Sequence, residues 1–227
     1  MLNKEYRYKE RVEILTVSLK SLATNLKYAT FTRLFEKGIH NGCVYNMAVC
    51  RNKSILISLG EDNLKVFNHT NEWNTHSTFE FQEQPICIDL HPSGDQIAVG
   101  FKTGTRLYQR LDSELKLAFE KFGKATITIC YNRGGSILAA SNALYIDIID
   151  PVRLQLLYTL WGHKGVVRSL FWTENAEIQG MKYLISTCNC GGIFFWRGNF
   201  KDFGYNKGQD EIEPEFSFYD NTCYFYD

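Results

Sequence analysis

The side chains in this sequence that could do chemistry are histidines, cysteines and acids, and their spacing decides which chemistry they could support. No nucleophile stands at a useful spacing from a general base. The sequence also contains no P-loop, no Rossmann fingerprint and no paired carboxylates at catalytic spacing. We therefore expect neither catalysis nor a bound cofactor.

Two nearby cysteines, Cys188 and Cys190, raise the alternative of a zinc site. A structural zinc ion takes four ligands, and no second ligand pair lies at metal spacing from these two. Asn189, between them, falls in the connection between two strand-like runs. We therefore interpret this segment as a turn and predict no metal site.

The elements that would position such side chains recur along the chain. Strand-like runs rich in β-branched and aromatic residues end at regular intervals of 41 residues, at Cys50, His91, Asn132 and Thr173. A turn, a second strand and a third strand follow each run. The third strands close on Phe67, Tyr108, Ile149 and Trp196. A strand-rich repeat of roughly 40–45 residues is typical of one blade of a β-propeller.

The repeats resemble WD-repeat blades. In that family a histidine, a serine, an aspartate and a tryptophan form a buried hydrogen-bonded relay, which satisfies polar groups removed from water. The resemblance implies that six residues play this structural part: His40, Ser58 and Asp62 in the first unit, and His163, Ser186 and Trp196 in the fourth. Phe67 replaces the tryptophan in the first unit, and Cys190 replaces the aspartate in the fourth. The middle units keep the strands but lack the relay.

We accordingly predict an all-β fold, a WD-repeat β-propeller of about four to five blades, as a closed ring or as an open, partial propeller. Residues 1–39 would form strands of a partial blade, 40–200 four WD-like blades, and 201–227 an acidic, aromatic tail. Residues 5–22 could alternatively form an amphipathic helix, and the tail a docked strand, a partner-binding segment or disorder. An open arc would leave unpaired edge strands, which invite another chain.

Composition limits the classes of partner and the compartment that we expect. The 227 residues carry a formal net charge of zero, so no overall field favours nucleic acid or a membrane surface. Neither a secretory signal nor an apolar run of about 20 residues is present, which predicts an intracellular protein with reduced cysteines. Basic residues on the third strands, Lys65 and Arg106, are expected on the solvated surface.

Several stretches, held in order, resemble the second propeller of the cilia- and flagella-associated protein 57 family. The most specific are Leu90-His91-Pro92-Ser93-Gly94 and the run 162–169, from Gly162-His163 to Arg168-Ser169, and the likeness covers about residues 10–197. It implies a scaffold of the ciliary axoneme that helps attach inner dynein arms near the regulatory complex and the radial spokes. The family's first propeller and coiled coil have no counterpart here, so coiled-coil dimerisation is not carried over.

Two functions remain open from the sequence. The first is a non-enzymatic protein–protein interaction scaffold in the cilium or flagellum, part of the cytoskeleton, which helps attach or regulate inner dynein arms. The alternative is a cytoplasmic WD-repeat adaptor in a non-ciliary complex for trafficking or ubiquitin-ligase recruitment. Blades carry no chemistry of their own, so the binding face is left to the structure.

Overall fold

The computed structural model describes residues 15–17, 31–33, 39–50, 52–68, 75–111, 114–173, 182–198 and 216–218. Within these ranges the chain forms strands and turns and no helix, so no helix there is long and apolar enough to cross a membrane. The strands make four antiparallel four-stranded sheets and one two-stranded sheet. The predicted all-β propeller fold is confirmed.

Each four-stranded sheet is a blade of consecutive strands, each hydrogen-bonded to the next. The first blade contains β3 (Val44–Cys50), β4 (Ile55–Gly60), β5 (Leu64–Asn68) and β6 (Thr75–Phe79). The second contains β7 (Cys87–Leu90), β8 (Gln96–Phe101), β9 (Gly104–Leu111) and β10 (Glu114–Phe122). The third contains β11 (Ile129–Tyr131), β12 (Leu138–Asn142), β13 (Tyr145–Asp150) and β14 (Gln155–Leu160). The fourth contains β15 (Val167–Trp172), β16 (Lys182–Cys188), β17 (Ile193–Gly198) and β18 (Phe216–Phe218).

The second strands show why these segments fold as they do. All six residues of β4 are buried, and so are all six of β8, because each strand lies inside its blade and is covered on both faces. A continuous apolar run suits such a strand better than strict alternation. Tight turns precede the second strands, and Gly94 and Gly135 adopt φ values of 76° and 70° there, which glycine reaches without steric cost.

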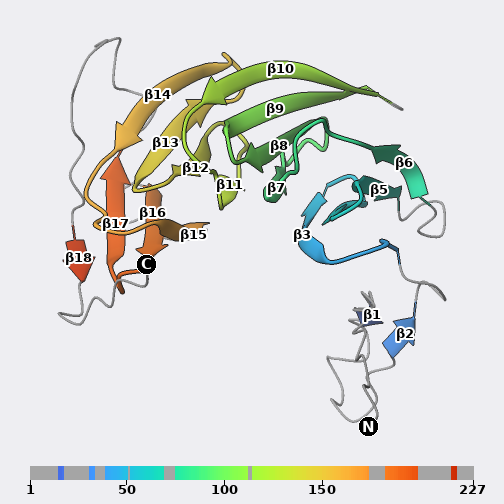
Figure 1. Cartoon of the computed structure of the whole chain (residues 1–227), viewed down its shortest axis with the longest axis horizontal. Helices are drawn as coiled ribbons and strands as arrows, with labels where there is room; N and C mark the ends of the chain where they lie inside the picture. The colour runs from blue at the N-terminus through green and yellow to red at the C-terminus, as the bar shows by residue number, and fades with distance from the viewer. Residues whose placement is uncertain are drawn as a thin grey trace, which may run out of the picture.

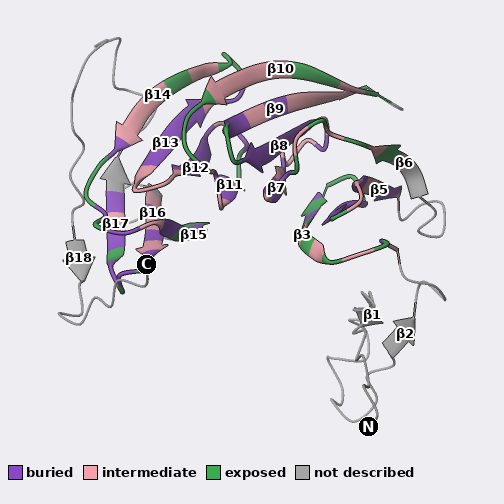
Figure 2. Cartoon of the chain, in the orientation of Figure 1, coloured by how far each residue is buried: buried purple, intermediate pink, exposed green. Residues whose placement is uncertain are grey.

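The blades fan out in an arc, with the first and fourth blades at its two ends (Figure 1). Neighbouring blades pack face to face through three apolar clusters. The first joins blades one and two, the second in chain order joins blades two and three, and the last joins blades three and four. Figure 2 shows that the buried residues run through the inner and middle strands of the arc.

The first strand of the third blade is shorter than the sequence predicts. A strand is expected at 127–132, but β11 spans only Ile129–Tyr131. The hydroxyl oxygen of Ser141 accepts hydrogen bonds from the backbone N–H groups of Ile127 and Thr128, at 2.8 and 3.1 Å. The Ser141 side chain thus accepts from two backbone donors just before this strand, while the Ser141 N–H donates to the Thr128 carbonyl at 2.9 Å.

Two short elements fall outside the repeating blades. β1 (Leu15–Val17) pairs antiparallel with β2 (Phe31–Arg33), within residues 1–39, where the sequence predicts strands, and at 15–17 the chain forms a strand and not the alternative helix. β18 pairs with β17 and gives the fourth blade its outer strand. The rest of the two terminal segments lies outside the described residues, and the domain boundaries at 39 and 200 stay predictions.

Candidate functional site

The three relay residues of the first blade lie together. Asp62 accepts a 2.5 Å hydrogen bond from Nδ1 of His40, and the hydroxyl of Ser58 lies 3.0 Å from His40 Nε2. Both His40 and Ser58 are buried. Burial alone would raise the pKa of Asp62, but hydrogen bonds from the His40 ring and the Asn41 backbone hold it below its usual value. The site ties the segment before β3 to β4 and to the turn before β5.

In the fourth blade three residues also meet, but the fourth member is missing. The indole N–H of Trp196 donates to Ser186 Oγ at 2.7 Å, which leaves the serine hydroxyl hydrogen for His163 Nε2, 2.6 Å away. His163 Nδ1 is buried and has no hydrogen-bond partner among the described residues. Burial lowers the pKa of His163 to about 4. The ring is therefore neutral, and its stack on Phe194, at 4.2 Å, is a contact between uncharged rings.

The blades are also joined to one another by hydrogen bonds that the sequence did not reveal. Three of these bonds link residues 42 positions apart on adjacent blades: Cys50 Sγ to the Pro92 carbonyl (3.1 Å), the Tyr131 N–H to Asp89 Oδ2 (2.7 Å), and Trp172 Nε1 to the Cys130 carbonyl (3.1 Å). Burial raises the pKa of Asp89 to about 6 despite two backbone N–H donors. The only signal for this role was an acid placed inside an apolar first strand.

Further hydrogen bonds link the second and third blades. The hydroxyl of Tyr131 donates to Gln96 Oε1 at 2.9 Å, and Gln96 Nε2 donates to the Pro151 carbonyl at 3.1 Å. His91 Nε2 lies 2.9 Å from the carbonyl oxygen of Gly135, so the predicted strand end at His91 also contacts the next blade. Polar groups at these junctions find their hydrogen-bond partners in the neighbouring blade, which fixes the position of one blade relative to the next.

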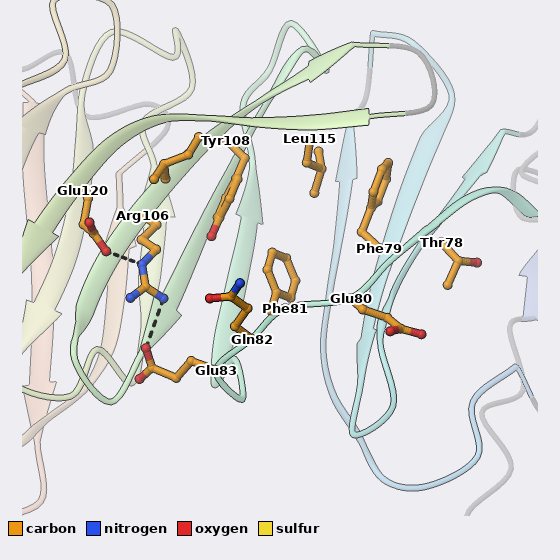
Figure 3. Close-up of a pocket in the computed structure, with 11 residues that line it drawn as sticks. Thr78, Phe79, Glu80, Phe81, Gln82, Glu83, Arg106, Tyr108, Leu115 and Glu120 are labelled. Atoms are coloured by element: carbon orange, nitrogen blue, oxygen red, sulfur yellow. Dashed lines mark hydrogen bonds and ion pairs between the residues drawn. The ribbon is translucent and has the colours of Figure 1, made fainter.

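A hollow lies between the first and second blades, near their outer strands. It has a volume of about 650 Å³ and is lined from β6, β9, β10 and the segment after β6 (Figure 3). Its apolar side contains Phe79, Phe81, Tyr108, Leu115 and Leu117. We call this hollow the blade 1–2 groove.

Aromatic contacts hold the floor of the groove in place. Phe81 meets Phe101 edge to face, with ring centroids 5.6 Å apart, and lies 5.4 Å from the ring of Tyr108. Leu117 is 47% exposed, so this apolar side is open to solvent. An apolar floor with fixed rings is the usual setting for anchoring side chains of a bound peptide.

Charge at the groove is dominated by acids. Arg106 pairs with Glu83 at 3.0 Å and with Glu120 at 2.5 Å, and its guanidinium lies 4.3 Å from the centre of the Phe101 ring. Burial alone would raise the pKa of Glu83, but hydrogen bonds from Thr103 and Arg106 hold it low. Glu80 also lines the groove, so the lining contains three carboxylates and one guanidinium. The groove therefore carries an acidic rim.

The sequence interpretation of the two basic third-strand residues was wrong. Arg106 has only 18% of its side chain exposed because two carboxylates and an aromatic ring surround it. Lys65 Nζ donates to the Ile39 carbonyl at 2.5 Å and is half-buried. Each is held by a local acceptor, and neither is a freely solvated surface charge.

The cysteine segment forms the turn that the sequence favoured. Asn189 and Cys190 connect β16 to β17, and the Gly191 N–H donates to the Cys188 carbonyl at 3.2 Å. Over the described residues no three histidine, cysteine or acidic side chains are grouped to hold a metal ion. Six cysteines in those ranges are free thiols, and burial raises the pKa of the Cys87 thiol to about 12.

Comparisons with known proteins agree with this architecture. No protein-family model matches the chain. It is 27% identical over 86% of its length to mouse "Cilia- and flagella-associated protein 57", and 27% identical over 70% to "Cilia- and flagella-associated protein 57 A" of Tetrahymena thermophila. The chain spans 15% and 12% of these relatives. The predicted resemblance to cilia- and flagella-associated protein 57 is confirmed.

A solved structure shows the same fold. The β-propeller domain of Myceliophteria thermophila Cps50 (Swd1) superposes with a TM-score of 0.66 at 17% identity, over 80% of this chain and 60% of that one. At this identity the likeness concerns the fold alone. The described blades thus share the fold of a solved β-propeller domain.

Proposed function

We propose that this chain is a non-enzymatic protein-interaction scaffold of the cilium, located at the axoneme. The observation that carries the proposal is the similarity to proteins named as cilia- and flagella-associated across 70–86% of the chain, on a propeller fold. A propeller presents a rigid surface on which other proteins assemble. We extend the proposal to a part in attaching or regulating inner dynein arms, with the regulatory complex and radial spokes as partners.

The blade 1–2 groove is the binding site that we assign to this function. Its aromatic floor combines Phe79 of β6 and Tyr108 of β9 with Phe81 of the connection after β6, whose ring packs on Tyr108, so a partner would meet a preorganised surface. The acidic rim favours a partner segment that combines an apolar anchor with lysine or arginine, because unlike charges attract and steer association. Arg106 positions Glu83 and Glu120 on this rim.

Proximity labelling of a tagged copy in ciliated cells tests the proposal. We expect the tag at the axoneme, with inner dynein arm and spoke components labelled. The variant Leu117→Asp, which places a charge on the exposed apolar floor, should reduce that labelling. Leu111→Asp is the matched control, since Leu111 is 51% exposed but does not line the groove. A signal confined to trafficking or ubiquitin-ligase complexes would instead support the adaptor alternative and overturn the ciliary proposal.

A further inference from the structure

The two ends of the arc expose sheet faces that every internal blade junction buries. At the first junction Ala48 of β3 lies in one cluster with Ile88 and Leu90 of the next blade. One repeat on, at the second junction, Asp89 accepts the N–H of Tyr131. One repeat further, the third junction joins the Cys130 carbonyl to Trp172. The same first-strand position therefore contacts the following blade each time.

The next residue in this series is Phe171 on β15. It is 60% exposed, whereas Ala48, its counterpart in the first blade, is 9% exposed. Ile185 lies directly opposite Phe171 on β16 and is half-buried, whereas its counterparts opposite the same first-strand position, Ile57, Ala98 and Ala139, are 0% exposed. Together with Ile193, which is 39% exposed, Phe171 and Ile185 form what we call the trailing face.

The first blade exposes the other half of this junction. Met47 and Val49 of β3 are 46% and 60% exposed, beside Tyr45 at 42%. The residues at the Met47 and Val49 positions in the other blades are at most 9% exposed, because each packs on the preceding blade: Ile88 and Leu90, Ile129 and Tyr131, Leu170 and Trp172. We call Tyr45, Met47 and Val49 the leading face.

The trailing and leading faces are therefore the two halves of one repeated junction. In the first junction, Ile88 and Leu90 of the second blade pack with Ala48 of the first. A leading face placed beside Phe171 would pack on it in the same way. These faces lie at opposite ends of the arc, so one molecule does not join its own two ends (Figure 1). Blades pack face to face, so the surface left uncovered at each end of the described arc is a sheet face, and recruitment of another chain by unpaired edge strands stays a prediction.

We propose that two copies of this chain associate head to tail, with the trailing face of each packed on the leading face of the other. Two such contacts, related by a two-fold axis, join the four described blades of each copy to those of the other. Apolar burial stabilises the contact, because both faces are aromatic or aliphatic. This inference does not depend on the blade 1–2 groove.

Sedimentation equilibrium and light scattering of the full chain test the proposal. The wild type is expected to form a dimer that dissociates on dilution. Phe171→Asp on the trailing face and Val49→Asp on the leading face should each raise the dissociation constant by at least roughly tenfold, because an unpaired carboxylate would be buried. Phe122→Asp and Val152→Asp are matched controls, at side chains 66% and 77% exposed and outside both faces.

Mixing the two variants is the most direct test of the head-to-tail contact. Phe171→Asp keeps an intact leading face and Val49→Asp an intact trailing face, so the mixture should form a heterodimer through one intact junction and associate more tightly than either variant alone. Circular dichroism and thermal unfolding verify that both variants fold. A wild-type monomer at all concentrations, dimers that survive both substitutions, equal dissociation in the controls, or failure of the mixture to associate would each overturn the proposal.

Discussion

Acidification should destabilise the fold through His163, and the size of the effect follows from its surroundings. The pKa of this ring is lowered to about 4 from the ordinary value of 6.5 by burial. The unfolded chain therefore binds a proton below about pH 6.5, whereas the folded chain stays neutral until about pH 4. The stabilisation is complete above the unfolded pKa and is lost as the pH falls. Linkage gives a loss of about 2 kcal/mol in unfolding free energy on going from about pH 7 to about pH 5.

Urea unfolding at the two pH values measures this loss. Other groups titrate over the same range, so the quantity to compare is the change in unfolding free energy for the wild type minus that for His163→Gln, which keeps a polar side chain but does not titrate. We expect the wild type to lose about 2 kcal/mol more than the variant. Equal losses in the two proteins would refute the reasoning.

A second substitution tests the cause of the low pKa. Ser186 precedes Cys190 by four residues, as Ser58 precedes Asp62, so position 190 corresponds to the aspartate that pairs with His40. In Cys190→Asp a carboxylate becomes available to His163 Nδ1, which has no partner among the described residues. An opposite charge favours the protonated ring, so the pKa of His163 should rise and the acid-induced loss should shrink. An unchanged or larger loss would show that the two positions are not equivalent.

Three further predictions concern the blade contacts. Asp89→Asn should abolish a component of stability that is present below about pH 4 and lost as the pH rises through about 6, since burial raises the pKa of Asp89 in the fold; urea unfolding at acidic and neutral pH detects the difference. Trp172→Phe removes the donor to the Cys130 carbonyl and should lower the unfolding free energy by about 1 kcal/mol in thermal scans, and no change would count against that bond. Ser186→Ala leaves the buried Trp196 N–H without its acceptor and should cost about 1–3 kcal/mol, checked by urea unfolding with tryptophan fluorescence.

The repeat was readable because it rests on backbone periodicity. Strand patterns and turn residues recur at a fixed interval, and β3 (Val44–Cys50) ends at the predicted residue, Cys50. Other strands differ from their predicted bounds where a side chain accepts hydrogen bonds from the backbone, as Ser141 does just before β11. Local pattern predicts which segments are strands but not which side chain takes over a backbone hydrogen bond.

The candidate site was harder to predict because it depends on contacts between blades. The two sets of histidine-centred contacts came from the resemblance to WD repeats, whereas Asp89 and Gln96 act through partners in the next blade, 42 and 35 residues away. The blade 1–2 groove uses Phe81 and Glu83, which lie after β6 in a connection with no periodic signal. Charge along the sequence could not show that Arg106 lies between two carboxylates.

The way in which the fourth blade obtains its last strand has a consequence for how the molecule opens. β18 is joined to β17 by three residue pairs, against six between β16 and β17, and residues 199–215 separate the two in the chain. Few hydrogen bonds therefore have to break to release β18 from β17. Amide hydrogens at the β17–β18 seam should therefore exchange with solvent deuterium well before those at the β16–β17 seam, through local opening that leaves the rest of the blade intact.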